Sequence, residues 1–196
     1  MKKNLLISLW MTMATTILFG LIYPLVVTGL AQLIFPRKAN GLLIRKDGQI
    51  IGSTLIGQGF SSPGYFHSRP SAAGNGWDAA NSGGSNLGPT NQKLLDRVKG
   101  DVATAQADNP GTPVPIDLVT TSASGFDPDV TPAAAEFQLA RVAKARGITV
   151  DQLRPLVAKH SAGRQIGVLG EPRVNVLELN LELDQQFPIN KQARIQ

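Results

Sequence analysis

The residues best suited to hold a ligand form a glycine-rich stretch in the first half of the chain. Ser82-Gly83-Gly84-Ser85-Asn86 precedes Leu87-Gly88-Pro89-Thr90 and then a segment with helical periodicity. Glycines let the backbone approach a ligand closely, and a helix start offers free N–H groups to an anion. The stretch predicts an anion or nucleotide site at Ser82, Gly83, Gly84, Ser85 and Asn86. The alternative is a structural turn followed by a helix N-cap, which the residue types alone favour.

Other residues that carry chemistry are sparse. The chain has neither the P-loop pattern G-x-x-x-x-G-K-[ST] nor the nucleophile elbow G-x-S-x-G. It has no cysteine, which excludes disulfides and thiolate zinc sites. His67 and His160 stand alone, and Asp127 and Asp129 flank Pro128 in a segment typical of turns and helix starts. We therefore expect no catalytic residue, no metal site and no cofactor of the chain's own.

An uncharged run dominates the N-terminus. Between Lys3 and Arg37 the sequence contains no Lys, Arg, Asp, Glu or His. A helix needs about 20 apolar residues to cross a bilayer core. We predict one transmembrane helix from Leu5 to about Val26, with an extension as far as Pro36. A cleaved signal peptide is the alternative, but its apolar core would span only about 7–15 residues.

Charge gives less information about partners and orientation. The formal net charge is +5, and the basic residues form no stripe interleaved with aromatics, so we expect no nucleic-acid partner. Lys2 and Lys3 directly precede the apolar run, which favours an N-terminus inside the cell. A count of Arg37, Lys38, Arg45 and Lys46 favours the opposite orientation. These residues lie farther from the lipid, and large domains translocate largely regardless of charge, so the residues alone slightly favour a domain outside the cytoplasm.

The remaining pattern predicts an α+β fold, with the anchor at residues 1–36 and one mixed domain at residues 37–196. Asp47-Gly48 predicts a hairpin within Gly41–Ile56. Helices are expected from Thr90 or Asn91 to about Gln106, from Thr131 to Gly147, and from Thr149 to about Lys159. Pro115–Thr121 is interpreted as a short buried strand. In Val174–Leu183 alternating leucines slightly favour a strand over a short helix capped by Asn175.

A long Gly-, Ser-, Pro- and Asn-rich stretch, about Gly57–Pro89, separates the hairpin from the first of these helices. A flexible linker would lack the aromatic residues that this stretch contains. We interpret it as an ordered loop that lies on a surface or a partner. The candidates for a partner interface are Gln58, Phe60, Tyr65, Phe66, Arg69 and Trp77.

Several blocks together resemble the C chain of the Kdp potassium-transporting ATPase and follow that family's order along the chain. They are Gly52–Gln58 with Phe60, Tyr65-Phe66, Arg69–Ala72, Ser82–Asn91, Asp117–Thr120, Ser122–Gly125, Ala134 and Gln138 with Arg141–Ala143, and Gly170–Leu177. Phe126 and Asp129 depart from the family pattern, in which Leu and His are expected. No role is carried over to these two side chains.

The resemblance implies a non-catalytic subunit of a bacterial inner-membrane complex that imports potassium at the expense of ATP. The implied partners are a channel-like potassium-translocating subunit and a P-type subunit that hydrolyses ATP. The family's C chain is described as a catalytic chaperone that raises the ATP affinity of the hydrolysing subunit, and as an assembly factor. Its domain is placed outside the cytoplasm, which conflicts with direct ATP contact. The alternative function is a membrane-anchored module that binds a ligand in the glycine-rich stretch.

Overall fold

The structure is a computed structural model that describes residues 1–189. It divides into two compact units, Met1–Ser53 and Thr54–Gln196. The predicted division after residue 36 therefore differs from the observed one, because residues 37–53 group with the N-terminal helix. The end of the predicted domain, residues 190–196, lies outside the described residues.

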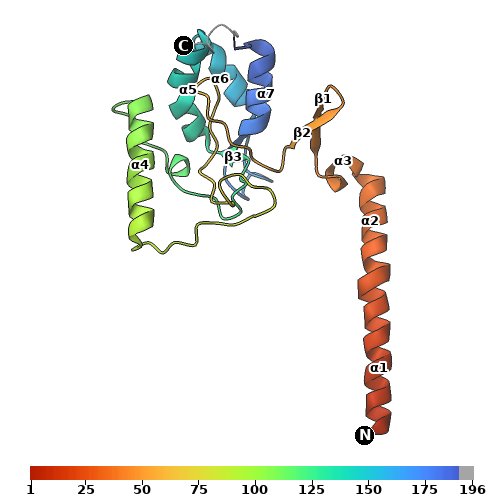
Figure 1. Cartoon of the computed structure of the whole chain (residues 1–196). Helices are drawn as coiled ribbons and strands as arrows, with labels where there is room; N and C mark the ends of the chain where they lie inside the picture. Colours follow the sequence, from red (N-terminus) through yellow and green to blue (C-terminus); the bar gives the residue numbers. More distant parts are fainter. Residues whose placement is uncertain (190–196) are drawn as a thin grey trace. The chain divides into compact units, whose positions relative to one another are not determined.

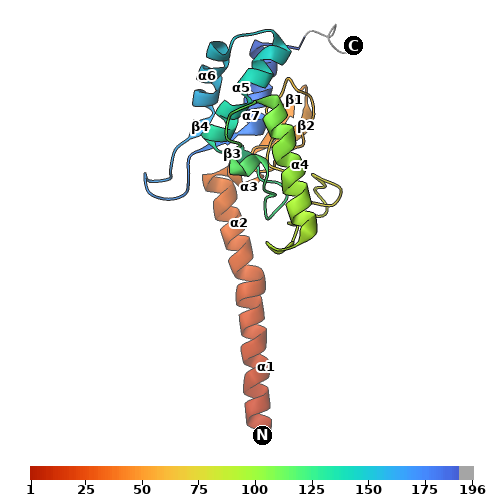
Figure 2. The ribbon, with the colours of Figure 1, turned by 90° about the vertical axis from the view of Figure 1, so that its left-hand side faces the viewer.

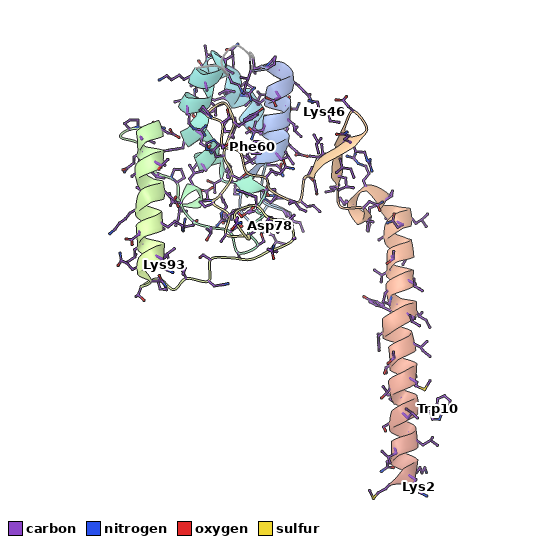
Figure 3. The ribbon with its side chains drawn as sticks, viewed as in Figure 1. Lys2, Trp10, Lys46, Phe60, Asp78 and Lys93 are labelled. Carbon is purple, nitrogen blue, oxygen red and sulfur yellow. The ribbon has the colours of Figure 1, made fainter. Side chains whose placement is uncertain are left out.

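A continuous helix forms most of the first unit. It consists of α1 (Lys2–Ile17), the π-helical η1 (Leu18–Ile22) and α2 (Tyr23–Ile34), and it is nearly straight in both views (Figures 1 and 2). Its 33 residues contain no buried side chain, and the labelled Trp10 extends outward (Figure 3). At 1.5 Å per residue the helix is about 50 Å long, more than the roughly 30 Å of a bilayer core. The predicted span is confirmed as a helix long and apolar enough to cross a membrane.

The π-helical turn has a local cause. Pro24 has no N–H to donate, and its ring clashes with the carbonyl four residues earlier in a regular helix. That residue is Gly20, at the centre of η1 (Leu18–Ile22). Widening the turn there relieves the clash while the helix continues.

A hairpin completes the first unit after the short helix α3 (Pro36–Ala39). Strands β1 (Leu43–Lys46) and β2 (Gln49–Ser53) pair antiparallel, with Lys46 opposite Gln49. Asp47 and Gly48 both have positive φ, at 50° and 79°, as a two-residue type I′ turn requires. The predicted hairpin is confirmed.

Three helices and a small sheet enclose the core of the second unit. Helices α5 (Pro132–Arg146), α6 (Val150–Lys159) and α7 (Val176–Gln186) pack together (Figures 1 and 2). Strands β3 (Asp129–Val130), β4 (Ser161–Ala162) and β5 (Arg173–Asn175) form an antiparallel sheet in the order β3-β5-β4. The core residues include Phe66, Leu139, Leu153, Leu179 and Leu183. The α+β fold class is confirmed.

Local capping signals set the starts of these helices. Thr131 accepts from the Ala134 N–H, and Pro132 takes the first helical position of α5. Gly147 ends that helix in the left-handed conformation, with φ at 68°. Thr149 and Gln152 form the reciprocal capping box that starts α6. Both predicted helices are confirmed.

Helix α4 (Gln92–Asp108) lies at the edge of the second unit (Figure 1). Asn91 caps it by accepting from the Lys93 N–H, so the predicted helix is confirmed. The predicted strand at Pro115–Thr121 is wrong, because the structure has a single 3-10 turn, η2 (Ile116–Leu118). Ile116 is 73% exposed. The buried Asp117 instead binds the Thr131 N–H at 2.7 Å, which a strand side chain facing an apolar core would not do.

The interpretation of Val174–Leu183 as a strand is also wrong beyond Asn175. Strand β5 ends at Asn175, whose side chain then accepts from the Glu178 N–H and starts α7. Val176, Leu179, Asn180 and Leu183 are buried, and their spacing is that of one helix face. The alternating leucines resemble a strand pattern, but several of them also occupy positions that α7 buries.

Candidate functional site

The predicted loop, about Gly57–Pro89, contains no helix but is held in place by side chains of α5 and α7. Asn180, which is 1% exposed, accepts from the Phe66 N–H and donates to the Phe66 carbonyl, both at 2.9 Å. This reciprocal pair of hydrogen bonds satisfies the N–H and the carbonyl of Phe66, which have no partner in a β-sheet. The prediction of an ordered loop is confirmed at Phe66. The surface on which the loop lies belongs to its own domain.

Helix α5 repeats this arrangement one residue further along. The Gln138 side chain accepts from the His67 N–H at 2.7 Å and donates to the His67 carbonyl at 3.1 Å. Arg141 supports it by donating to Gln138 at 2.7 Å and to the Pro63 carbonyl at 2.7 Å. Partial burial and the nearby Arg141 guanidinium lower the pKa of His67, so its neutral form is favoured.

A buried arginine holds the part of the loop that directly precedes Phe66. The side chain of Arg146 is fully buried and donates to the Gly64 carbonyl at 2.6 Å and to the Phe187 carbonyl at 2.6 Å. It also pairs with Asp184 at 2.8 Å and stacks on the Tyr65 ring at 4.8 Å. The Tyr65 hydroxyl donates to Asp184 at 2.8 Å. Burial, together with this hydrogen bond to Asp184, raises the pKa of Tyr65.

Trp77 packs against other residues of the same loop, and Arg69 joins the loop to Asp127. Cβ atoms added at Gly57 and Gly59 would lie 2.8 and 2.7 Å from the Trp77 ring, so only glycine admits this contact. Arg69 pairs with Asp127 at 2.9 Å, and its guanidinium also donates to the Thr121 carbonyl at 3.5 Å. These residues hold the segment against the stretch around Asp127.

A cavity of about 240 Å³ lies between this segment, α4 and α5. Phe60 (labelled in Figure 3), Arg69 and Trp77 line it from the segment. Helix α4 contributes Asp101, Thr104, Ala105 and Asp108, and other lining residues include Leu118, Phe137, Gln138 and Arg141. The structure thus brings three of the predicted interface residues together, but around a partly open cavity of the domain.

The glycine-rich stretch lies elsewhere and is engaged with its own domain. The Ser82 hydroxyl and the Gly83 N–H both donate to the Ser124 carbonyl, at 2.9 and 3.1 Å. A Cβ added at Gly84 would lie 3.2 Å from the Ala123 carbonyl oxygen. None of the residues 82–86 lines the cavity beside α4. The close approach that Gly84 allows is thus made by the chain itself, at Ala123.

The predicted interface residues fall into two groups. The side chain of Phe66 has no exposed area, which corrects its assignment to a surface: it belongs to the core beneath the segment. Gln58, Phe60, Tyr65, Arg69 and Trp77 are half-buried. Replacing Tyr65, Phe66 and Trp77 together would therefore disturb folding, because Phe66 is part of the core.

The residues that organise the segment were not singled out as site residues from the sequence. Asn180 and Gln138 are polar side chains on the buried faces of α7 and α5. A buried amide on an apolar helix face needs a hydrogen-bond partner. An amide among the apolar positions of a helix was therefore the sequence signal for these two residues. For Asn180 it was hidden because its segment was interpreted as a strand.

Acidic side chains gather around a second hollow of about 340 Å³ at the sheet. Asp117, Asp127, Asp129 and Glu171 line it, with Arg69 and Arg173. Burial raises the pKa of Asp129, against the opposing effect of Arg173, which lies 3.2 Å away. Within residues 1–189 no group of three or more His, Asp or Glu side chains is arranged to hold a metal ion.

Comparison with known proteins identifies one family. The family model described as "KdpC: K+-transporting ATPase, c chain" matches residues 5–185. A Potassium-transporting ATPase KdpC subunit from Koribacter versatilis is 65% identical over 96% of this chain and 98% of its own. Those from Acidobacterium capsulatum and Rhodopseudomonas palustris are 60% and 55% identical, over 89% and 94% of this chain and 94% and 98% of theirs.

Proposed function

Because the chain belongs to the KdpC family, the c chains of K+-transporting ATPases, we propose that it is a non-catalytic accessory subunit of an ATP-driven potassium-uptake complex. The observation that carries this proposal is the extent of the match, which includes both the apolar helix and the α+β domain. We propose as partners a channel-like potassium-translocating subunit and a P-type subunit that hydrolyses ATP.

The apolar helix supports a single-pass location in the bacterial inner membrane. Its lack of buried side chains leaves its whole surface to lipid or to other helices. We propose an inside N-terminus, which Lys2 and Lys3 favour, and therefore an α+β domain outside the cytoplasm. A domain placed there has no access to cytoplasmic ATP.

The chaperone role is therefore proposed as an effect passed through the assembled complex. The chain stabilises the complex, and the stabilised complex binds ATP with higher affinity. The contacts of Ser82 and Gly83 with Ser124 support this reading, since these groups are already used within the domain. The alternative is an anchored module that binds a nucleotide or anion at Ser82–Asn86, as a helix start or glycine loop can.

Reconstitution tests the proposal. The ATP-hydrolysing and potassium-translocating subunits are purified with and without this chain, and potassium-stimulated hydrolysis is measured across a range of ATP concentrations. We expect the chain to lower the ATP concentration needed for half-maximal rate or to prevent loss of the complex on dilution. The isolated chain should hydrolyse no more ATP than a heat-denatured control. Hydrolysis by the isolated chain would refute the proposal.

A further inference from the structure

The segment between β4 and β5 presents apolar side chains at its tip. Ile166, Val168 and Leu169 are 90%, 71% and 57% exposed. In Figure 2 this part of the chain, in blue after β4, extends away from the helices of its unit. Exposed apolar side chains that occur singly need no explanation, whereas apolar side chains grouped in one place are typical of interaction sites.

The tip is ordered by its own hydrogen bonds. Gln165 and Leu169 exchange two backbone hydrogen bonds, at 2.8 and 2.9 Å. At the base of the turn, Arg164 binds both carboxylate oxygens of Glu171, at 2.9 and 2.8 Å. A turn fixed in this way loses little conformational entropy when it binds a partner.

Ile166 occupies a backbone conformation that its side chain disfavours. Its φ is 54°, in the left-handed region where β-branched residues are outliers and glycine is favoured. A residue kept there at 90% exposure gains nothing from packing within the domain. Strain of this kind is typical of functional positions, and here the function must lie in what the side chain meets outside the domain.

The charges beside the tip indicate what it meets. Glu171, at the base of the turn, lines the hollow that also contains Asp117, Asp127 and Asp129. Arg164, Arg173 and Arg69 are engaged by Glu171, Asp129 and Asp127. In the lining of this hollow, Asp117, Asp127, Asp129 and Glu171 outnumber Arg69 and Arg173, and even with Arg164 the formal charge of the surroundings is negative. An anionic lipid surface attracts basic residues near apolar anchors. The three arginines near the tip are already paired with carboxylates, which favours a protein partner over lipid.

We propose that the tip formed by Ile166, Val168 and Leu169 docks into an apolar socket, bordered by Lys or Arg side chains, on another protein subunit of the same membrane complex. The apolar side chains fill the socket, and the basic border faces the acidic hollow at the base of the turn. This proposal rests on the proposed function, because it requires that the chain be a subunit.

Substitution of Ile166 by glycine provides a test that separates docking from folding. Glycine adopts a φ of 54° without strain, so Ile166→Gly leaves the thermal midpoint of the full chain unchanged or slightly raised. The same change removes the anchoring side chain, and truncation of an interface anchor weakens binding about tenfold or more. We therefore expect the double variant Ile166→Gly with Val168→Ser to be lost from the affinity-purified complex at dilutions that retain the parent chain.

The matched control is Leu95→Ser. Leu95 is 41% exposed but lies on α4, whose residues do not line the acidic hollow, and its substitution should leave retention unchanged. Equal retention of the tip variant and the parent chain would overturn the docking proposal while leaving the subunit role intact. If the parent chain itself is not retained, both proposals fail.

Photo-crosslinking identifies the occupant of the tip. A benzophenone amino acid is placed at position 166 of the full chain in cells that produce the whole complex. We expect a covalent adduct with another subunit of the complex, identified by mass spectrometry at a peptide containing Lys or Arg. An adduct with lipid, an adduct with a second copy of this chain, or no adduct would each overturn the proposal.

Discussion

Asn180 and Phe66 form a closed pair: one side-chain amide serves both the N–H and the carbonyl of one backbone unit, each at 2.9 Å. The two residues are 114 positions apart, and both are buried. The pair lets a segment without strand partners lie directly against the core. The loop, about Gly57–Pro89, is consequently part of the domain's framework.

Replacing Asn180 by leucine should destabilise the domain strongly. The change leaves the Phe66 N–H and carbonyl buried without partners, and each unsatisfied group costs about 1–3 kcal/mol. We expect a loss of about 2–4 kcal/mol in the free energy of unfolding, measured by urea denaturation of the detergent-solubilised chain. The control Gln185→Leu, on the exposed side of α7, should change it by less than about 0.5 kcal/mol. Equal effects of the two changes would show that the pair does not stabilise the fold.

Features fixed by neighbouring residues were accessible from the sequence. The Asp47-Gly48 turn and the capping residues Thr131 and Thr149 act within four positions, and their elements appear where predicted. The apolar helix was equally clear, because it depends on composition alone.

Features fixed by distant contacts were not accessible. The role of Asn180 depends on Phe66, and that of Gln138 on His67, 71 positions away. The assignment of Phe66 to an interface failed for the same reason: exposed and buried aromatics in a loop look identical until the helix that covers them is known. The wrong strand at Pro115–Thr121 arose because the apolar pattern could not show that Asp117 binds Thr131.

Acidification should weaken the domain in two steps. The pKa of His67 is lowered from 6.5 by burial, so as the pH falls below 6.5 the unfolded chain takes up this proton first and stability declines. Hydrogen bonds from Lys159 and His160 lower the pKa of Glu182 from 4.5. Its contribution is therefore complete above pH 4.5 and is lost as the pH falls through the folded-state value.

Urea midpoints measured between pH 7.5 and 3.5 check both steps. His67→Gln should flatten the profile just below pH 6.5, and Glu182→Gln should flatten it below pH 4.5. Profiles parallel to that of the parent chain would contradict these assignments.

Gly83 and Gly84 provide a matched pair that separates ligand binding from folding. A Cβ added at Gly83 meets nothing within 4 Å, whereas one at Gly84 lies 3.2 Å from the Ala123 carbonyl oxygen. Gly83→Ala should leave folding, assembly and the ATP dependence of the complex unchanged. Gly84→Val, with its larger side chain, should reduce assembly. A fall in ATP affinity with Gly83→Ala in an intact complex would favour the nucleotide site at Ser82–Asn86.

The orientation of the domain has a direct consequence for protease access. If residues 41–196 lie outside the cytoplasm, protease added to intact spheroplasts should digest them without lysis, while a cytoplasmic marker protein survives. Lys93, exposed near the start of α4, offers a trypsin site outside the proposed docking tip. Protection of the domain until the membrane is broken would reverse the proposed topology.

Co-purification tests the central claim, that this chain is a subunit of a potassium-transporting ATPase complex, most directly. The chain is tagged at its C-terminus and purified in mild detergent from membranes of cells that also produce the channel-like and ATP-hydrolysing subunits. A chain in which residues 5–34 are replaced by an unrelated transmembrane helix serves as a further sample. The account predicts that both partners co-elute with the parent chain in fixed proportion and that the replaced helix weakens this retention. Elution of the parent chain alone, from membranes that contain both partners, would contradict it.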